Sequence, residues 1–245
     1  MLSIPHIGFW QNVLHGPSAW IFTFVLAVVF PLLDYTLYAR LKSTLQLYVW
    51  NIAAEWALAA ACIWQIRTHG LRVADLGERL ENPLRTLAVV TLLTAVTGVL
   101  IVVGKKQKHQ ASPAQVSKAL DKVRRLIPES KSERRAFVAV ALTAGACEEL
   151  LYRGWLLNLL AAAWGSTWMG CAVSAVVFGL AHAYQGRSGI IGTSLLGCVF
   201  GILFLLTGSL LPGQVLHTAI DLNNGLALGK IVRRFESQQS GSAGT

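Results

Sequence analysis

The chain has 245 residues, of which 54% are hydrophobic and 13% are charged, with a formal net charge of +9 and a mean hydropathy of +0.53. A soluble domain carries about 25% charged residues, so this chain has too few to cover a surface exposed to water. Its apolar segments are continuous rather than alternating, which argues against a β-barrel. The composition indicates an integral membrane protein built from helices.

The predicted elements are long uncharged runs. Residues 1–33 and 188–220 contain no Lys, Arg, Asp or Glu. A helix needs about 20 apolar residues to cross the hydrocarbon core, so each of these runs holds more than one element. Residues 155–164 are too short to cross alone and are expected to form a half-span or re-entrant segment. We predict an all-α, polytopic transmembrane helix bundle with seven or eight membrane helices, and spans at 17–39, 46–66, 84–103, 136–152, 167–186, 189–207 and 212–230.

Positive charge gathers in one connecting segment, because ten of the 21 Lys and Arg residues lie between Lys105 and Arg135. Short basic loops stay cytoplasmic, which places this loop inside, and we expect a multi-pass protein of the bacterial cytoplasmic (inner) membrane. Apolar residues recur at helical spacing within 113–127, which indicates either an amphipathic helix on anionic lipid headgroups or a solvated linker. Nucleic-acid binding, the other interpretation of a basic block, is not expected.

Ionisable side chains also lie within or beside the predicted spans, where each costs about 2.5–3.5 kcal/mol at the bilayer centre, so they tend to face a bundle interior or a wet cavity. They are Asp34, Glu55, Glu148, Glu149, Arg153, His182, His217 and Asp221. Glu149 and Arg153 share a helix face and can form an ion pair. Glu148 points about 100° away from Glu149, so its carboxylate is available for a different role. His217 and Asp221 have the same spacing, so the carboxylate orients the imidazole or both face one cavity.

A glutamate, two histidines and an aspartate on three helices form a set that can take a proton from water, position the water and stabilise developing charge. Three short motifs carry them in order: EExxxR (Glu148, Glu149, Arg153), FxxxH (Phe178, His182) and HxxxD (His217, Asp221). This order resembles the CPBP family, which comprises CAAX prenyl endopeptidases and bacteriocin-processing or self-immunity (Abi) proteins. The resemblance covers residues 136–230. It implies an intramembrane endopeptidase that hydrolyses a peptide bond in a membrane-embedded or lipid-proximal substrate.

The resemblance also implies a role for each residue of the first two motifs and for the second histidine. Glu148 matches the general base that activates water. His182 and His217 match the histidines that bind and polarise the water or the oxyanion. Glu149 and Arg153 match the supporting pair, in agreement with the helical-wheel argument.

Asp221 matches the last motif position, which is asparagine in many members of the family. An asparagine can donate a hydrogen bond to an oxyanion and an ionised aspartate cannot, so Asp221 is expected to orient His217 or to be protonated. No HExxH or other compact zinc motif occurs, yet Glu148, His182, His217 and Asp221 are acceptable zinc ligands. We favour a reaction without a metal cofactor, and a divalent metal such as zinc is the alternative.

The two histidines raise a geometric difficulty. His182 closes one predicted helix and His217 begins another two elements later, so a complete crossing by 189–207 would place them near opposite membrane faces. We therefore predict that this crossing is incomplete or that the turn at 208–213 dips into the membrane, where protein walls can satisfy its backbone. Asp34 and Glu55 match no motif and are expected either at the interface or against a partner in the bundle.

The chain is expected to divide into N-terminal membrane helices with the basic loop (1–135), a catalytic membrane core (136–230) and a disordered tail (231–245). Two other functions stay open. A non-catalytic immunity or scaffold protein would use the polar cluster to bind a peptide. A proton-coupled transporter would use the same acids as a relay, although the paired halves with matching broken helices that many transporters have are not evident.

Overall fold

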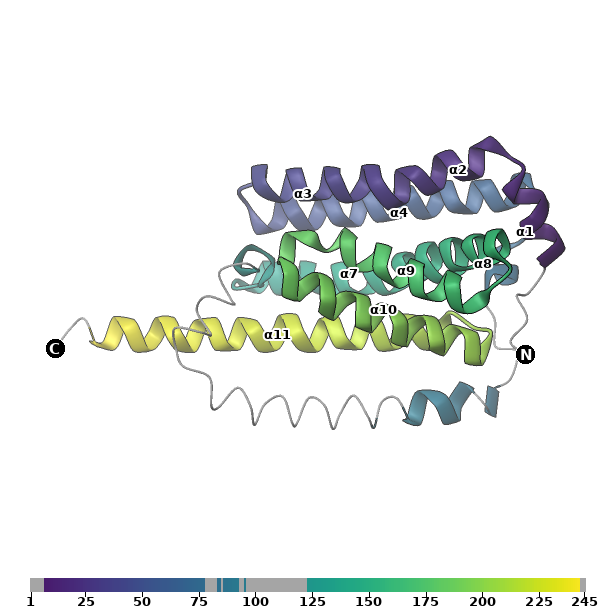
Figure 1. Ribbon diagram of the computed structural model, residues 1–245. Coiled ribbons are helices and arrows are strands. Elements are labelled where there is room, and N and C mark those ends of the chain that lie inside the picture. Colours follow the sequence, from purple (N-terminus) through teal and green to yellow (C-terminus); the bar gives the residue numbers. More distant parts are fainter. Residues whose placement is uncertain (1–6, 78–82, 85, 93–94, 96–122, 243–245) are drawn as a thin grey trace.

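The computed structural model describes residues 7–77, 83–84, 86–92, 95 and 123–242. These ranges form helices joined by turns and contain no β-strand, so the predicted all-α class is confirmed. The longer helices lie side by side as a layered bundle (Figure 1). One layer holds the N-terminal helices, the next holds the segment from 131 to 181, and a third holds the two C-terminal helices, with the described residues between 83 and 95 beyond it.

The N-terminal layer begins with α1 (Ile7–Leu14) and contains two long rods. The first rod joins α2 (Pro17–Phe24), the π-helical η1 (Val25–Val29) and α3 (Phe30–Arg40); the second is α4 (Thr44–Thr68), followed by the short η2 (Val73–Leu76). Pro17 suits the start of its helix, because the first helical N–H groups have no partner within the helix. At 24 and 25 residues, both rods are long and apolar enough to cross a membrane. Helices therefore stand where the sequence predicts spans 17–39 and 46–66.

The middle layer contains one unbroken helical run. α7 (Lys131–Glu148), the π-helical η4 (Glu149–Leu157) and α8 (Asn158–Trp164) follow one another with helical backbone at both junctions. The sequence predicts a span at 136–152 and a separate segment at 155–164, and that division is wrong. The wider turns of η4 carry the helix through the polar stretch instead of ending it. The run begins at a capping box, in which Ser130 and Glu133 bond to each other's backbone N–H groups.

The remaining helices are α9 (Thr167–Ala181), η5 (Ala183–Gln185), α10 (Arg187–Thr207) and α11 (Leu211–Ser242). α10 is the third helix in the described part of the chain that is long and apolar enough to cross a membrane, whereas α9 has only 15 residues. α11 continues through 231–242, so the backbone there is helical rather than the predicted disordered tail. Most of the predicted span 84–103 and of the helix at 113–127 lies outside the described residues; the end of the latter forms the short η3 (Arg124–Leu126).

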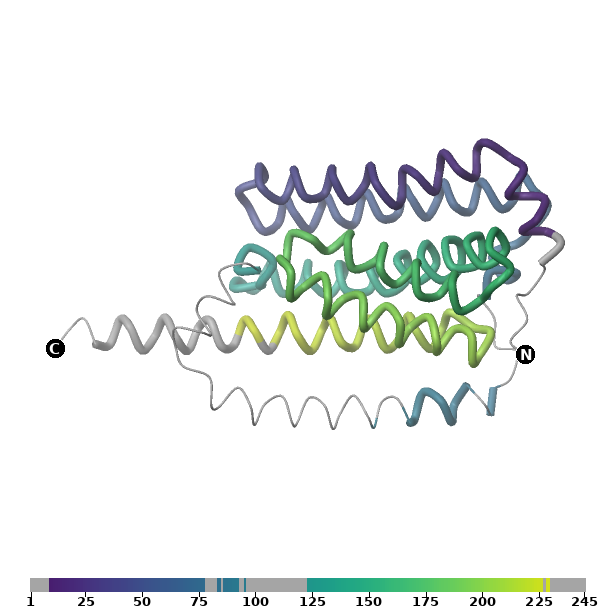
Figure 2. The backbone as a smooth tube through the Cα atoms, in the orientation of Figure 1, coloured from purple at the N-terminus to yellow at the C-terminus, as the bar shows by residue number. Residues whose placement is uncertain are grey.

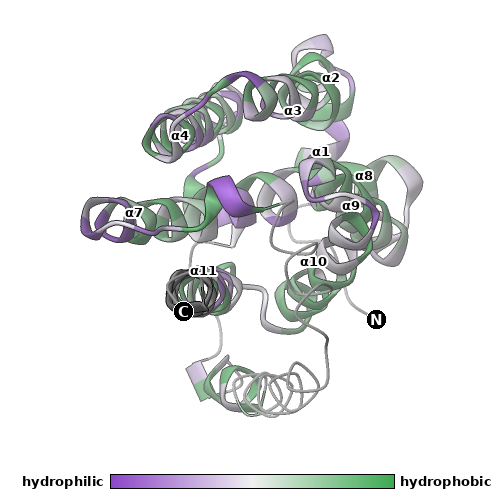
Figure 3. Ribbon diagram, turned by 90° about the vertical axis from the view of Figure 1, so that its left-hand side faces the viewer, coloured by the Kyte–Doolittle hydropathy of each residue, from purple (hydrophilic) through white to green (hydrophobic). Residues whose placement is uncertain are grey.

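Large apolar side chains are exposed on the long helices, and Figure 3 shows much of α2 and α10 in the green of hydrophobic residues. Leu32, Val49, Trp64, Ile191 and Leu195 are each between 61% and 67% exposed. Apolar surface of this extent suits acyl chains rather than water. With three helices able to cross a bilayer, it identifies an integral membrane protein.

The interior of the bundle is built around η4, which Figure 2 traces through the middle of the molecule. All nine of its residues are buried, and it packs against α4, α7, α9 and α10. The ring of Trp155 is enclosed by Trp10 and Phe22, at centroid distances of 5.6 and 5.2 Å, and its indole N–H donates to Thr23. These contacts hold η4, which carries Glu149 and Arg153, in place.

Candidate active site

Glu149 and Arg153 form a buried ion pair at the centre of the bundle. Nη1 of Arg153 lies 2.8 Å from Oε1 of Glu149, and each side chain is only 1% exposed. The guanidinium also donates to the backbone oxygen of Gly197 on α10, at 3.1 Å, and lies over the rings of Phe178 and Phe200. The predicted pair is therefore present, and it connects η4 to α9 and α10.

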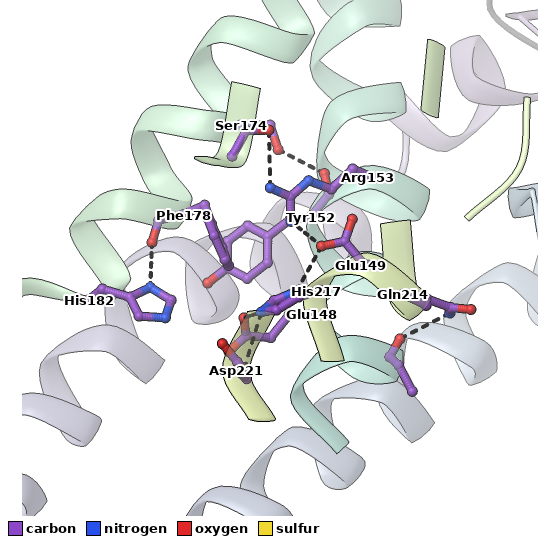
Figure 4. A network of polar contacts seen from close by, with 12 residues as sticks. Glu148, Glu149, Tyr152, Arg153, Ser174, Phe178, His182, Gln214, His217 and Asp221 are labelled. Atoms are coloured by element: carbon purple, nitrogen blue, oxygen red, sulfur yellow. Dashed lines mark hydrogen bonds and ion pairs between the residues drawn. The ribbon is translucent and has the colours of Figure 1, made fainter. Parts of the chain in front are cut away.

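His217 approaches this pair from α11. Its Nδ1 lies 3.0 Å from Oε1 of Glu149, the same oxygen that accepts from Arg153 (Figure 4). The imidazole stacks on the ring of Phe200, with centroids 5.0 Å apart and planes inclined by 19°. The sequence offers Asp221 as the group that orients His217, but the shorter contact comes from Glu149. A carboxylate that is already paired with an arginine accepts the Nδ1 proton, which turns Nε2 towards the rest of the site.

Glu148 and Asp221 lie on the other side of the same imidazole. Nε2 of His217 is 3.6 Å from Oε2 of Glu148 and 3.6 Å from Oδ2 of Asp221. Both separations are too long for a direct hydrogen bond. Oε2 of Glu148 is buried and has no hydrogen-bond partner among the described residues. A buried carboxylate oxygen without a protein partner is available to accept a hydrogen bond from a water molecule or a substrate group.

His182 stands at the C-terminal end of α9. Its Nδ1 lies 2.8 Å from the backbone oxygen of Phe178. A carbonyl oxygen only accepts, so Nδ1 carries the proton and Nε2 of the neutral ring is an acceptor. The Phe178 ring lies 4.8 Å from the His182 ring and 6.0 Å from the His217 ring, measured between centroids. Phe178, which the sequence marks as a packing residue, therefore stands between the two histidines.

The two histidines reach one region of the bundle, although α10 between them is a complete helix. The predicted incomplete crossing is thus not found in α10, which has all of its 21 residues in helical conformation. The turn after it is buried: Ser209 and Leu210 are almost fully covered, and the Leu210 N–H donates to the Gly77 oxygen at 2.8 Å. Such internal bonds are what a broken backbone needs away from water.

Small residues allow α11 to approach η4 and α7 closely. A Cβ atom placed on Gly213 would lie 3.0 Å from Oε2 of Glu149, and one placed on Gly145 would lie 2.8 Å from the backbone oxygen of Gln214. Glycine at these two positions removes a side chain from each contact. The approach brings His217, one turn further along α11, to hydrogen-bond distance from Glu149.

The N-terminal helices add two carboxyl groups that match no motif. Glu55 on α4 is 4% exposed, and its Oε2 has no hydrogen-bond partner in the described ranges; its charge interacts with those of Glu148 and Asp221. Asp34 on α3 accepts from the indole N–H of Trp50, at 3.1 Å, and interacts electrostatically with His182. Glu55 lies in the bundle interior rather than at the interface, but its Oε2 does not have the partner that the sequence analysis expects there. The signal was its position in the middle of an apolar span.

A metal site requires several ligand side chains that point at one common position. Zinc in proteins is held by three or four His, Cys, Asp or Glu side chains around one point. Within the described part of the chain, no group of three or more such side chains is placed to hold a metal ion. Glu148, His182, His217 and Asp221 are thus not gathered as a ligand group among the described residues, and a reaction without a metal stays a prediction.

Comparison with known proteins gives one result for this region. A family model described as type II CAAX prenyl endopeptidase Rce1-like matches residues 132–223. Neither the curated proteins nor the solved structures contain a match to the chain. The matched range begins at the start of α7 and ends just after Asp221, so it includes the three motifs and the ion pair of Glu149 and Arg153.

Proposed function

We propose that this protein is an intramembrane endopeptidase in which Glu148 activates water, because residues 132–223 match the family model of type II CAAX prenyl endopeptidase Rce1-like proteins. The observation that carries the proposal is the position of Oε2 of Glu148. It is buried, has no hydrogen-bond partner among the described residues, and lies 3.6 Å from Nε2 of His217. The distance between these two atoms is too long for a direct hydrogen bond. A water molecule that lies next to both atoms can form a hydrogen bond with each of them.

The reaction follows from this arrangement. Water attacks the carbonyl carbon of the peptide bond as Glu148 removes one of its protons, and the carbonyl oxygen becomes an oxyanion. Glu148 then passes that proton to the leaving nitrogen as the C–N bond breaks, so the carboxylate is regenerated. A positioned general base of this kind contributes about 10²–10⁴ to the rate.

The neighbouring groups position and polarise the reactants. Glu149, held by Arg153, fixes the ring of His217 through Nδ1 and leaves Nε2 facing Glu148. His182 presents an accepting Nε2 because Nδ1 is bonded to the Phe178 oxygen. In the proposal these histidines hold the water and face the developing charge. Asp221 borders the same position through its contact with His217.

The proposal includes no metal cofactor, and a divalent metal such as zinc is the alternative that a chelator tests. It includes a peptide or protein substrate that lies in or next to the membrane, and no nucleic acid. We further propose seven or eight membrane crossings in a bacterial inner membrane, with the buried turn at 208–213 dipping inward. In this topology the basic segment between Lys105 and Arg135 faces the cytoplasm, where its charge suits anionic lipid.

The test is cleavage by purified protein in liposomes. The candidate substrates are membrane peptides and a prenylated C-terminal peptide. Glu148→Gln keeps the shape of the side chain and removes its basicity, so we expect cleavage to fall by about 10²–10⁴ while the amount of folded protein stays the same. Glu129→Gln, on an exposed side chain outside the site, is the matched control and retains full activity. A chelator leaves the wild-type rate unchanged. Full activity in Glu148→Gln contradicts the role of that glutamate, and loss of activity with chelator contradicts the metal-free chemistry.

A further inference from the structure

The hydroxyl of Tyr152 is a second buried group without a partner beside Glu148. The side chain is 2% exposed, and its oxygen has no hydrogen-bond partner among the described residues. Four buried side-chain oxygens share this property in the described part of the chain, and three of them belong to Glu55, Glu148 and Tyr152. These three groups also interact electrostatically with one another. The three side chains therefore belong to one part of the bundle interior.

Tyr152 is held in place from both ends. Its backbone oxygen accepts from Oγ of Ser174 on α9, at 2.7 Å. Its ring meets the edge of the Phe178 ring, with centroids 5.0 Å apart. It follows Glu148 by four residues in the same helical run, a spacing that puts two side chains on one face. Figure 4 shows Tyr152 among Glu148, Phe178 and His182.

Packing alone does not account for the hydroxyl. A phenylalanine would keep the contact with Phe178 and would not bury an oxygen without a hydrogen bond, which is unfavourable in a protein interior. Buried tyrosine hydroxyls normally have a partner. The hydroxyl is therefore available to a water molecule or to a group that arrives with a ligand.

The site needs a donor more than another acceptor. The carboxylates of Glu148 and Asp221 only accept when ionised. Nδ1 of His182 donates to a carbonyl oxygen, so Nε2 of that neutral ring accepts as well. Nε2 of His217 lies 3.6 Å from the carboxylates of both Glu148 and Asp221, so a proton that it carries is directed at them. Arg153 directs its nitrogens at Glu149 and at the Gly197 oxygen. The Tyr152 hydroxyl supplies an O–H donor whatever the charge of the two histidines.

We propose that Tyr152 is a catalytic residue whose hydroxyl donates a hydrogen bond to the substrate carbonyl oxygen as that oxygen becomes the oxyanion. The inference rests on the proposed endopeptidase function. When water adds to the carbonyl carbon, the C–O bond forms, the electron pair of the C=O bond moves to oxygen, and Glu148 takes the water proton. Tyr152 keeps its own proton and only shares it. The bond to Tyr152 shortens as negative charge develops, which stabilises the transition state more than the substrate.

This role also accounts for the aspartate at the last motif position. An ionised Asp221 cannot donate to an oxyanion, and its Oδ2 lies 3.6 Å from Nε2 of His217. With a tyrosine donor one helical turn from Glu148, the reaction does not depend on a donor at position 221. An asparagine introduced there should then take over when the hydroxyl is removed.

The experiment compares kcat and KM for cleavage of one membrane peptide. Tyr152→Phe is expected to lower kcat by about 10²–10³ with little change in KM, the effect of removing one oxyanion donor. Its thermal unfolding midpoint should not fall. Tyr48→Phe is the matched control. The Tyr48 hydroxyl lies outside the site and donates a hydrogen bond of 2.7 Å to the backbone oxygen of Leu126. This variant should unfold at a lower temperature and keep its kcat.

The double variant Tyr152→Phe/Asp221→Asn tests the chemistry directly. We expect its kcat to recover at least tenfold over Tyr152→Phe, whereas a purely structural role for the tyrosine predicts no recovery. A wild-type kcat in Tyr152→Phe, or an equal loss in the double variant, overturns the inference. If Glu148→Gln is inactive and Tyr152→Phe is fully active, only this inference fails. If Glu148→Gln cleaves as wild type does, the proposed function fails first.

Discussion

Oε1 of Glu149 lies 2.8 Å from Nη1 of Arg153 and 3.0 Å from Nδ1 of His217, so one carboxylate oxygen joins an arginine on η4 to a histidine that lies 68 residues after Glu149 in sequence. The arginine neutralises the carboxylate, and the carboxylate sets the tautomer and direction of the imidazole. Glu149 thus acts on the candidate chemistry through His217, without facing the position beside Glu148.

Removing the arginine should expose how much the fold depends on this arrangement. Arg153→Met leaves the carboxylate of Glu149 buried without its cation, and we expect the free energy of unfolding to fall by about 3–5 kcal/mol. Arg40→Met, on an exposed residue at the end of α3, should change it by less than about 0.5 kcal/mol. Unfolding in detergent, followed by circular dichroism, measures both.

A double variant separates stability from function at the same place. Glu149→Leu/Arg153→Met removes both buried charges and should regain most of the stability lost in Arg153→Met. Its activity should stay low, because His217 loses the group that orients it. Recovery of activity together with stability would show that the pair is only structural.

The close approach of α11 to α7 leads to a second prediction. A Cβ atom on Gly145 would lie 2.8 Å from the Gln214 oxygen, so Gly145→Ala must push α11 and His217 away from α7. A displacement of about 1 Å can lower the rate 10²-fold. Gly192→Ala on α10 is the control, because a Cβ atom there meets nothing within 4 Å. Equal cleavage rates for the two variants would mean that the contact does not position His217.

Glu55 should lower the free energy of unfolding of the protein without bound substrate. Its Oε2 is buried with no hydrogen-bond partner among the described residues. Glu55→Met fills nearly the same volume without a carboxyl group, so we expect the free energy of unfolding to rise by about 1–3 kcal/mol. Glu55→Gln keeps a polar group there and should give a smaller gain. A loss of stability in Glu55→Met would mean that this carboxyl group is satisfied in the folded protein.

The capping box at the start of α7 gives a prediction about pH. The carboxylate of Glu133 accepts from the backbone N–H groups of Ser130 and Glu129, which lowers the pKa of Glu133 below its usual value of 4.5. Because the folded pKa is the lower one, the stabilisation is complete above pH 4.5 and is lost as the pH falls through the folded value. The difference in unfolding midpoint between wild type and Glu133→Gln should therefore shrink below pH 4.5.

Ser130→Ala provides the comparison for that measurement. It removes the other half of the capping box, at a cost of about 1 kcal/mol, but no titrating group. Its effect should vary less with pH than that of Glu133→Gln. If the two variants show the same pH profile, the carboxylate of Glu133 is not the source of the dependence.

The features that the sequence predicts well depend on local spacing. Glu149 and Arg153 are one helical turn apart, so their pairing follows from either helix geometry. The apolar rods at 17–40 and 187–207 follow from length and composition. The approach of His217 to Glu149 depends instead on how α11 packs against η4, and helical spacing alone carries no information about packing between distant segments. The position of Glu55 in the middle of an apolar span predicts its burial, but its electrostatic interaction with Glu148 on another helix is hidden for the same reason.

The division at 152–155 was wrong for a different reason. A polar stretch followed by a short apolar segment predicts the end of one helix and the start of another. In the structure the chain changes from an α-helix to a π-helix at Glu149 and continues. Nothing in residue composition distinguishes a helix that ends from one that widens. The π-helical segment can be identified only in the folded structure, where it packs against the surrounding helices.

That widened segment has a consequence for sequence length. A π-helical turn holds extra residues compared with an α-helical turn, so η4 shifts the phase of every side chain that follows it. Deleting one residue between Tyr152 and Leu157 would return the run to ordinary winding and rotate α8 by roughly 100° relative to α7. Trp155 and Asn158 would then leave their partners, although the composition of the chain would hardly change. Homologues of this protein should tolerate substitution in this stretch far better than a change in its number of residues.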